Sequence, residues 1–146
     1  MHNLGQTRSA RRADHVLLTP DTFVRAPLPG MRRCTAVVHA GPALGAAFTE
    51  YTAEFEADGV LRSTQAQRFA YVLEGSVEVE AASTKAGLGP GGYAYFPEEL
   101  EHRVTATRES KVIVIEKAYR RLQNSKPPEL IVSVESAVQS LSLIHI

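Results

Sequence analysis

Apolar and polar residues alternate along several short segments of this 146-residue chain. In the segment Phe48–Glu56, the side chains of Tyr51, Ala53 and Phe55 fall on one side of an extended chain, and glutamate and threonine fall on the other. A period of two with one charged side predicts a strand that is half exposed to water. The segment Lys111–Tyr119 is almost continuously apolar, which predicts a strand buried on both faces.

Glycine and proline turns separate the other extended segments. Cys34–Ala40 and Tyr93–Phe96 are short and suited to strands, and Asp58-Gly59 between two extended segments predicts a turn. Arg68–Ala81 predicts a β-hairpin whose two strands pivot on Gly75-Ser76. Short strands at regular spacing, with no convincing helix between them, predict an all-β sandwich or barrel. The length of the chain favours a single domain.

The two ends of the chain differ from this strand-rich middle. Residues 1–15 predict an irregular N-terminal arm, residues 16–119 the folded domain, and residues 120–146 a linker and a tail. Pro127-Pro128 suits a linker, and the segment beyond it could form a short helix or an extra strand. We expect that segment to be mobile or loosely docked. Ser140–Ile146 resembles sequence from a cloning adaptor as much as a natural terminus, and we assign it no function.

Composition and charge narrow the class of protein. Lys plus Arg total 16 and Asp plus Glu total 16, so nothing indicates binding to nucleic acid or to an anionic membrane surface. No apolar run approaches the ~20 residues that a membrane-spanning helix needs. Cys34 is the single cysteine and cannot form an internal disulfide, so we expect a reducing, cytoplasmic setting.

Two glycine-bounded segments carry a recognisable motif pattern. In the second segment Gly91 is followed after five residues by Pro97 and then by His102, and in the first segment "VLEG" closes on Gly75. These segments resemble the two motifs of the cupin superfamily, whose members are small double-stranded β-helix (jelly-roll) barrels. The resemblance implies that fold. In cupins a His-x-His pair and a Glu from the first motif join the His of the second to hold Mn, Fe, Ni or Zn.

The first motif lacks its ligands in this sequence. Arg68 occupies the position of the Glu, and no way of counting the motif places a histidine at the His-x-His positions. A guanidinium is always protonated and only donates hydrogen bonds, so Arg68 and His102 would present two positive groups to a cation. The sequence therefore predicts no metal site in this chain. It leaves Arg68 and His102 as candidates for lining a ligand pocket.

A narrower resemblance covers residues 4 to about 119. Segments such as "LGAAFTEYTAEF", "QRFAYVLEGSVEVE" and "GGYAYFPEELEH" are similar to the N-terminal half of the (S)-ureidoglycine aminohydrolase family. The resemblance implies a hydrolase of purine (allantoin) catabolism that converts ureidoglycine to ureidoglycolate and ammonia. It also implies that each enzyme has two cupins and that the second cupin holds Mn²⁺. Because the second cupin is absent from this sequence, the resemblance implies no cofactor and no catalytic residue in this chain.

Two hypotheses about function follow from these observations. In the first, the chain is the non-catalytic cupin of such an enzyme, whose small-molecule substrate is ureidoglycine, and it contributes scaffold and assembly surface, at least as a homodimer. In the second, it is a stand-alone, metal-free cupin that binds a small anionic or polar ligand through Arg68. A metal-dependent enzyme with one cupin is disfavoured because the motif positions supply one ligand and such sites need at least three.

Overall fold

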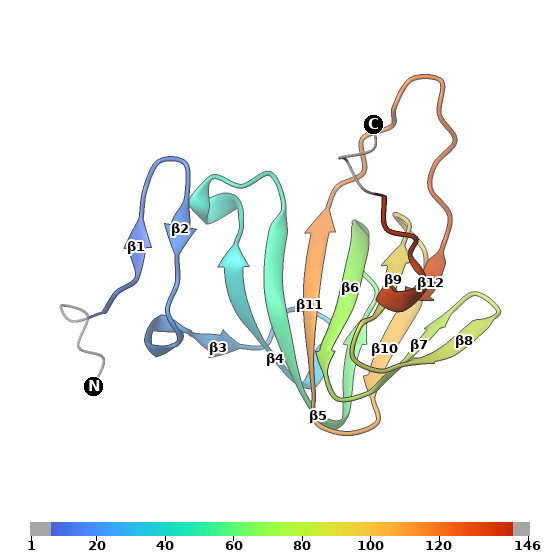
Figure 1. Cartoon of the computed structure of the whole chain (residues 1–146), viewed down its shortest axis with the longest axis horizontal. Coiled ribbons are helices and arrows are strands. Elements are labelled where there is room, and N and C mark those ends of the chain that lie inside the picture. The colour runs from blue at the N-terminus through green and yellow to red at the C-terminus, as the bar shows by residue number, and fades with distance from the viewer. Residues whose placement is uncertain (1–6, 142–146) are drawn as a thin grey trace.

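The computed structural model describes residues 7–141, and the regular structure in this range is almost entirely extended chain (Figure 1). The all-β prediction is therefore confirmed. The strands are β1 (Ala10–Arg11), β2 (Val16–Leu17), β3 (Arg25–Ala26), β4 (Met31–Ala40), β5 (Thr49–Arg62), β6 (Gln67–Glu74), β7 (Val77–Ala81), β8 (Thr84–Leu88), β9 (Gly92–Phe96), β10 (His102–Ala106), β11 (Ser110–Lys117) and β12 (Ile131–Val134). Three single-turn 3₁₀ helices accompany them: η1 (Pro20–Thr22), η2 (Pro42–Leu44) and η3 (Glu135–Ala137).

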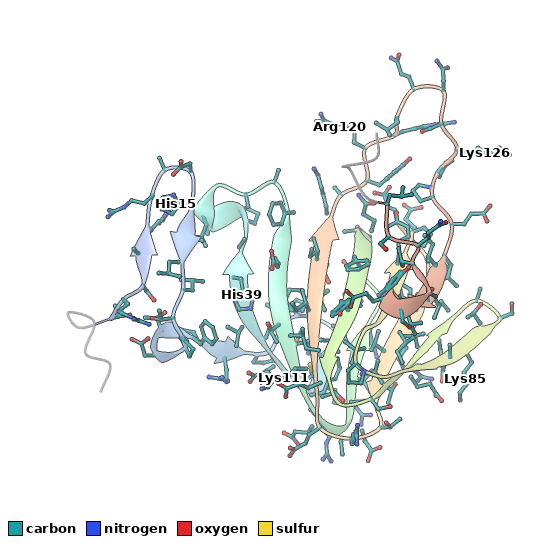
Figure 2. The ribbon with its side chains drawn as sticks, viewed as in Figure 1. His15, His39, Lys85, Lys111, Arg120 and Lys126 are labelled. Carbon is teal, nitrogen blue, oxygen red and sulfur yellow. The ribbon has the colours of Figure 1, made fainter. Side chains whose placement is uncertain are left out.

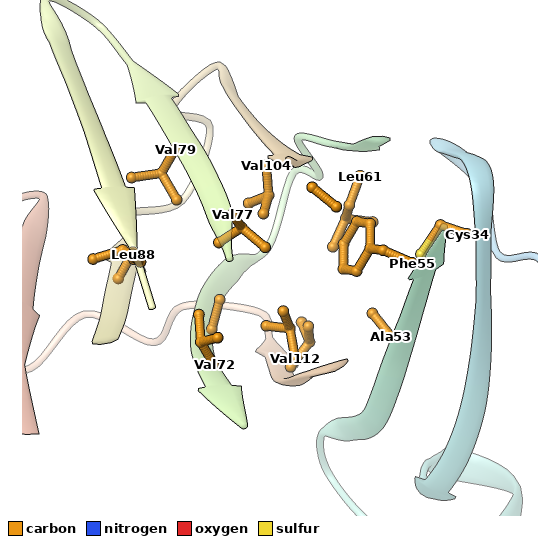
Figure 3. Close-up of a cluster of buried hydrophobic side chains, with 14 of the residues drawn as sticks. Cys34, Ala53, Phe55, Leu61, Val72, Val77, Val79, Leu88, Val104 and Val112 are labelled. Atoms are coloured by element: carbon orange, nitrogen blue, oxygen red, sulfur yellow. The ribbon is translucent and has the colours of Figure 1, made fainter. Parts of the chain in front are cut away.

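Ten of these strands form one antiparallel sheet that folds over into a nearly closed barrel. The strand order is β12-β9-β6-β11-β5-β10-β7-β8, and β4 pairs with β5 and β3 beside this path. Strands β6, β9 and β11 make one wall, and β7, β8 and β10 make the facing wall. Valine and leucine side chains from both walls meet between them (Figure 3). The single-domain, double-stranded β-helix expected of a cupin is confirmed.

The pleat of the strands decides which side chains fill the barrel. Along β6, Arg68, Ala70 and Val72 point inward and are buried, whereas Phe69 and Tyr71 point outward and are partly exposed. The same alternation holds in β7, β9, β10 and β11, so alternate residues of these strands supply most of the core. The barrel interior is consequently filled by side chains.

Strand β11 departs from its prediction. It was expected to be buried on both faces, yet only the inward residues Val112 and Val114 are fully buried, and Ile113 and Ile115 on the outer face are partly exposed. The reason is that no second layer covers the outer face among residues 7–141. A continuous apolar run therefore does not by itself establish that a strand is covered on both sides.

Strand β5 runs through Asp58-Gly59, so the prediction of a turn at this position is wrong. Asp58 has a φ of 62° and bends the strand, and opposite it the pairing register of β4 shifts around Arg33. A Cβ at Gly59 would overlap the carbonyl oxygen of Arg33, so glycine is required at this bend. The first half of β5 pairs with β11 and its end pairs with β10, which carries the sheet from one wall to the other.

The predicted hairpin over Arg68–Ala81 is also wrong. Strands β6 and β7 lie in different walls: β6 pairs with β9 and β11, and β7 pairs with β8 and β10. Gly75 makes this crossing possible, since its φ is 87° and a Cβ there would overlap the hydroxyl of Ser110. The chain therefore changes walls at Gly75-Ser76 without folding back on itself.

The N-terminal segment contains a small hairpin where the sequence predicts an irregular arm. Strands β1 and β2 pair with each other and lie apart from the barrel (Figure 1), and their pairing spans the boundary placed after residue 15. Hydroxyl groups hold the base of the hairpin through short hydrogen bonds among Thr7, Ser9, Thr19 and Thr22. Residues 1–6 lie outside the described residues.

The C-terminal segment joins the barrel. Strand β12 pairs with β9, the hydroxyl of Tyr71 donates to Glu135 at 2.6 Å, and Leu130 and Val132 pack against the core. The expectation of a detached tail is therefore wrong for residues 130–135, and of the two alternatives the extra strand is observed. Ser140–Ile146 lies outside the described residues except for its first two positions. Within residues 7–141 no helix has the length and apolar composition to cross a membrane.

Candidate functional site

The structure brings together the two residues that the sequence singles out. Arg68 lies on β6 in one wall of the barrel, and His102 begins β10 in the other wall. Their side chains meet across the interior, with Arg68 Nη1 at 2.8 Å from His102 Nε2. Both residues are buried, with 2% of Arg68 and 4% of His102 exposed. The contact therefore links the two walls from inside the barrel.

Two further residues complete this polar cluster, and sequence reasoning missed both. Glu116 on β11 accepts through Oε1 from Arg68 Nε at 2.8 Å, and the same oxygen forms a salt bridge with Arg68 Nη2 at 2.6 Å. The hydroxyl of Tyr51 on β5 donates to the same oxygen at 2.8 Å. A signal existed in the sequence, because Glu116 is the one carboxylate in an apolar strand and shares the inward parity of Val112 and Val114.

The hydrogen bonds of His102 fix its tautomer. Its Nδ1 lies 2.7 Å from the carbonyl oxygen of Leu100, which can only accept, so Nδ1 carries the hydrogen. Its Nε2 therefore accepts from Arg68, whose guanidinium can only donate. The imidazole also stacks on Phe96 with a centroid distance of 3.9 Å and an interplanar angle of 4°. The ring is held on all sides as a neutral acceptor.

The charge state of His102 differs from the expectation that Arg68 and His102 are both positively charged. Burial, together with the nearby positive charge of Arg68, lowers the pKa of His102 to about 4, although its bond to Leu100 works in the opposite direction. At neutral pH the interior therefore holds one positive group, Arg68, and not two. The carboxylate of Glu116 lies against that group, so the cluster is an internal ion pair with a neutral imidazole beside it.

The cluster does not fit a metal ion. The Nε2 lone pair of His102 is directed at Arg68, and the guanidinium fills the space in front of Glu116. No group of three or more His, Cys, Asp or Glu side chains in residues 7–141 is placed to hold a metal. Figure 2 shows His15 on the β1–β2 hairpin and His39 on β4, both away from β10. The donors needed for Mn, Fe, Ni or Zn are not assembled here.

No activated nucleophile accompanies the cluster. Burial raises the pKa of the Cys34 thiol to about 12, so this side chain is an inert thiol at neutral pH. Burial likewise raises the pKa of Tyr51 well above its ordinary value, which keeps its hydroxyl a donor to Glu116. The arrangement can hold the barrel together and can present polar groups, but it shows no acid–base pair or nucleophile poised for chemistry.

A surface pocket of about 490 Å³ opens beside His102. It is lined by Arg62, Glu80, Ala81, Ala82, Glu101, His102 and Arg103. Arg103 donates to Glu80 at 2.6 Å, so part of its charge is already matched. Arg68 is almost fully buried, and its guanidinium donates hydrogen bonds to Glu116, His102 and the carbonyl oxygen of Arg62. Of the two candidate pocket residues, His102 is the one that reaches this pocket.

Comparison with known proteins agrees with the fold. Residues 44–119 match the EutQ-like cupin domain family. The chain is 30% identical to a probable (S)-ureidoglycine aminohydrolase of Oryza sativa subsp. japonica over 135 residues, which is 90% of this chain and 43% of that protein. It is 31% identical to the (S)-ureidoglycine aminohydrolase of Arabidopsis thaliana over 131 residues, which is 88% of this chain and 44% of that protein.

A solved structure is similar over almost the whole chain. The crystal structure of protein Ylba from E. coli has a TM-score of 0.82 at 24% sequence identity, and the match covers 92% of this chain and 58% of that one. At this identity the likeness establishes the fold. The chain spans less than half the length of the two curated plant relatives.

Proposed function

Because the chain belongs to the EutQ-like cupin domain family, we propose that it is the metal-free cupin half of an (S)-ureidoglycine aminohydrolase and serves as scaffold and assembly surface. The observation that carries this proposal is the Arg68–Glu116–His102 cluster, which fills with an internal ion pair the place where a cupin would assemble its metal ligands. The match to less than half of each plant enzyme supports a division of labour between two halves.

The cluster suits a scaffold role. Arg68 and Glu116 come from adjacent strands of one wall, and His102 comes from the facing wall, so their hydrogen bonds hold the walls at a fixed separation. Every buried side-chain nitrogen and oxygen in residues 7–141 has a hydrogen-bond partner. A rigid, fully satisfied interior is what a supporting domain needs, and it leaves the chemistry to another part of the enzyme.

The proposal also covers the substrate, the metal, the oligomeric state and the cellular location of the enzyme. The substrate of the whole enzyme is ureidoglycine, the Mn²⁺ belongs to the other cupin, and copies of the chain assemble as at least a homodimer. Partly exposed apolar and aromatic side chains on the outer face of β6, β9 and β11 support assembly: Phe69, Tyr71, Tyr93, Ile113 and Ile115. A cytoplasmic location is supported by the single, free and buried Cys34.

A chimeric enzyme tests the scaffold role directly. This chain replaces the matching 44% of the Arabidopsis thaliana enzyme, and ammonia release from ureidoglycine is measured after circular dichroism confirms a folded β protein. We expect activity within about tenfold of the parent enzyme, since the reacting groups lie in the other half. A matched chimera carrying Arg68→Ala should lose stability more than it loses kcat. A folded chimera without activity would contradict the proposal.

The chain alone provides the complementary test. Purified protein should release no ammonia from ureidoglycine above background and should contain less than one Mn, Fe, Ni or Zn per chain by elemental analysis. Light scattering coupled to gel filtration should give a dimer or larger species. Ammonia release by the chain alone, abolished by His102→Ala, would overturn the non-catalytic role.

The pocket beside His102 supports a second candidate function. A stand-alone cupin could bind a small carboxylate there through Arg62 and not through Arg68, because Arg68 is buried and does not line the pocket and Arg103 is already paired with Glu80. In that case a panel of small carboxylic acids should contain at least one that raises the melting temperature of the wild-type protein, with the rise lost in Arg62→Ala. If no member of the panel does so, the scaffold role stands alone.

A further inference from the structure

The guanidinium of Arg68 is buried among hydrogen-bond acceptors inside the barrel. Three of the five guanidinium N–H groups of Arg68 donate hydrogen bonds inside the barrel, and Nη2 lies at salt-bridge distance from the carboxylate of Glu116. The edge formed by Nε and Nη2 faces Glu116 Oε1 at 2.8 and 2.6 Å. The two hydrogens of Nη1 are directed at the carbonyl oxygen of Arg62 at 2.7 Å and at His102 Nε2 at 2.8 Å. The acceptors therefore surround a planar, forked cation.

The acceptors are held in place without help from Arg68. Glu116 Oε1 also accepts from the hydroxyl of Tyr51, and the imidazole of His102 is fixed by its bond to Leu100 and by stacking on Phe96. The Arg62 carbonyl belongs to the end of β5, which pairs with β10. Each acceptor thus has a second, independent anchor, so the site should persist when the guanidinium is removed.

We propose that Glu116, His102 and the Arg62 carbonyl form a guanidinium-selective cation site inside the barrel, which the side chain of Arg68 occupies in the native protein. The selectivity follows from geometry. A guanidinium presents donors on two edges in one plane and satisfies a carboxylate, a carbonyl and an imidazole at once. A compact ammonium ion has its donors at tetrahedral angles and reaches only part of this set. The inference does not depend on the function proposed above.

Chemical rescue tests this site. Arg68→Ala removes the guanidinium and leaves a cavity lined by the same acceptors. Methylguanidinium at low millimolar concentration should raise the melting temperature of Arg68→Ala by about 3–6 °C at ten times its Kd, because it binds the folded state only. Wild-type protein should show no rise at the same concentrations, since its site is filled. Ammonium at equal concentration should not substitute.

Two controls define the site. Arg103→Ala removes an exposed arginine that pairs with Glu80 at 2.6 Å, and methylguanidinium should not stabilise this variant. Arg68→Ala combined with Glu116→Gln keeps the cavity but removes its negative charge, and the rescue should fall at least tenfold in affinity. Equal rescue of Arg68→Ala and Arg103→Ala, no rescue of a folded Arg68→Ala protein, or equal rescue by ammonium would each overturn the proposal.

A measurement on the wild-type protein covers the case in which Arg68→Ala does not fold. In ¹⁵N NMR spectra the Nε–H of Arg68 should exchange with water at least a hundredfold more slowly than that of Arg62, whose side chain is exposed. The nitrogens of His102 should show the tautomer with hydrogen on Nδ1. An Arg68 Nε–H that exchanges as fast as that of Arg62, or a His102 with hydrogen on Nε2, would refute the site.

Discussion

The two ends of the barrel interior are built from the same strands yet contain opposite chemistry. On β6 and β11 the inward residues at one end are Val72 and Val112, which pack against valines and leucines of the facing wall (Figure 3). Four residues further along the same faces, the inward residues are Arg68 and Glu116. Burial is equally complete at Arg68 and at the valines. The difference lies in what each end needs to be stable.

The apolar end requires only close contact, whereas the polar end requires every partner to be present. A buried valine is stabilised by removal of its surface from water and by packing. A buried guanidinium is tolerated only because a carboxylate, a carbonyl and an imidazole satisfy it. A single substitution should therefore lower the stability far more at the polar end, because removing one partner leaves a buried charge unpaired. Four experiments test this difference, in order of decreasing effect.

The largest loss is expected on removing the carboxylate that pairs with the buried Arg68. Glu116→Ala leaves the guanidinium of Arg68 buried without its anion, and we expect the free energy of unfolding to fall by about 3–5 kcal/mol in urea titrations. The control is Glu80→Ala, which breaks the exposed pair with Arg103 and should cost less than about 1 kcal/mol. Equal losses in the two variants would show that burial does not distinguish them.

The second largest effect is a dependence of stability on acidity. The folded-state pKa of His102 is lowered from 6.5 to about 4, so the unfolded chain binds the proton first as pH falls. The contribution of His102 is therefore complete above pH 6.5, declines below it and is lost as pH passes through about 4. Up to roughly 3 kcal/mol should disappear over this window.

Urea titrations at a series of pH values measure this dependence. His102→Asn cannot titrate in the window, so its stability should fall less steeply between pH 6.5 and 4 than that of the wild type. Carboxylates are common to both proteins and cancel in the difference between the two profiles. Parallel profiles would mean that His102 is not held neutral by the fold.

A smaller effect is expected at the apolar end. Val112→Ala removes two methyl groups from a side chain that is fully buried, which should cost about 2 kcal/mol through lost burial and a small cavity. The loss should not vary between pH 7 and 5, because no ionisable group of the cluster is touched. A loss equal to that of Glu116→Ala would remove the distinction between the two ends.

The smallest effect is expected for a polar bond on the outside of the barrel. Tyr71→Phe deletes the 2.6 Å hydrogen bond to Glu135, which lies in an exposed position. Stability should change by less than about 1 kcal/mol, because water replaces the lost partner.

Limited proteolysis should cut both the wild-type protein and Tyr71→Phe between Ser125 and Glu129, and β12 should remain bound to the nicked barrel. If either protein unfolded after this cut, the expectation that β12 stays bound to a folded barrel would be contradicted.

The sequence predicted several of the strands correctly but not the partners with which they pair. The alternation in Phe48–Glu56 predicted which face of β5 is buried, and Tyr51, Ala53 and Phe55 are all buried. The same kind of evidence failed at Gly75-Ser76, where a turn between two strands predicts a hairpin but the chain crosses between walls. Period and turn chemistry are local, whereas the choice of pairing partner depends on the whole sheet.

For the candidate site, the sequence by itself determined that a cation, Arg68, stands where a cupin has a carboxylate and that His102 lacks other histidines as partners. Only the tertiary structure decided what these residues do. Glu116 and Tyr51 lie 48 and 65 positions from their partners Arg68 and Glu116, so no spacing rule joins them. The neutral state of His102 likewise depends on its burial between Phe96 and Arg68. Burial and long-range contact set the charge and the hydrogen-bond role of a side chain, and both exist only once the walls of the barrel have closed.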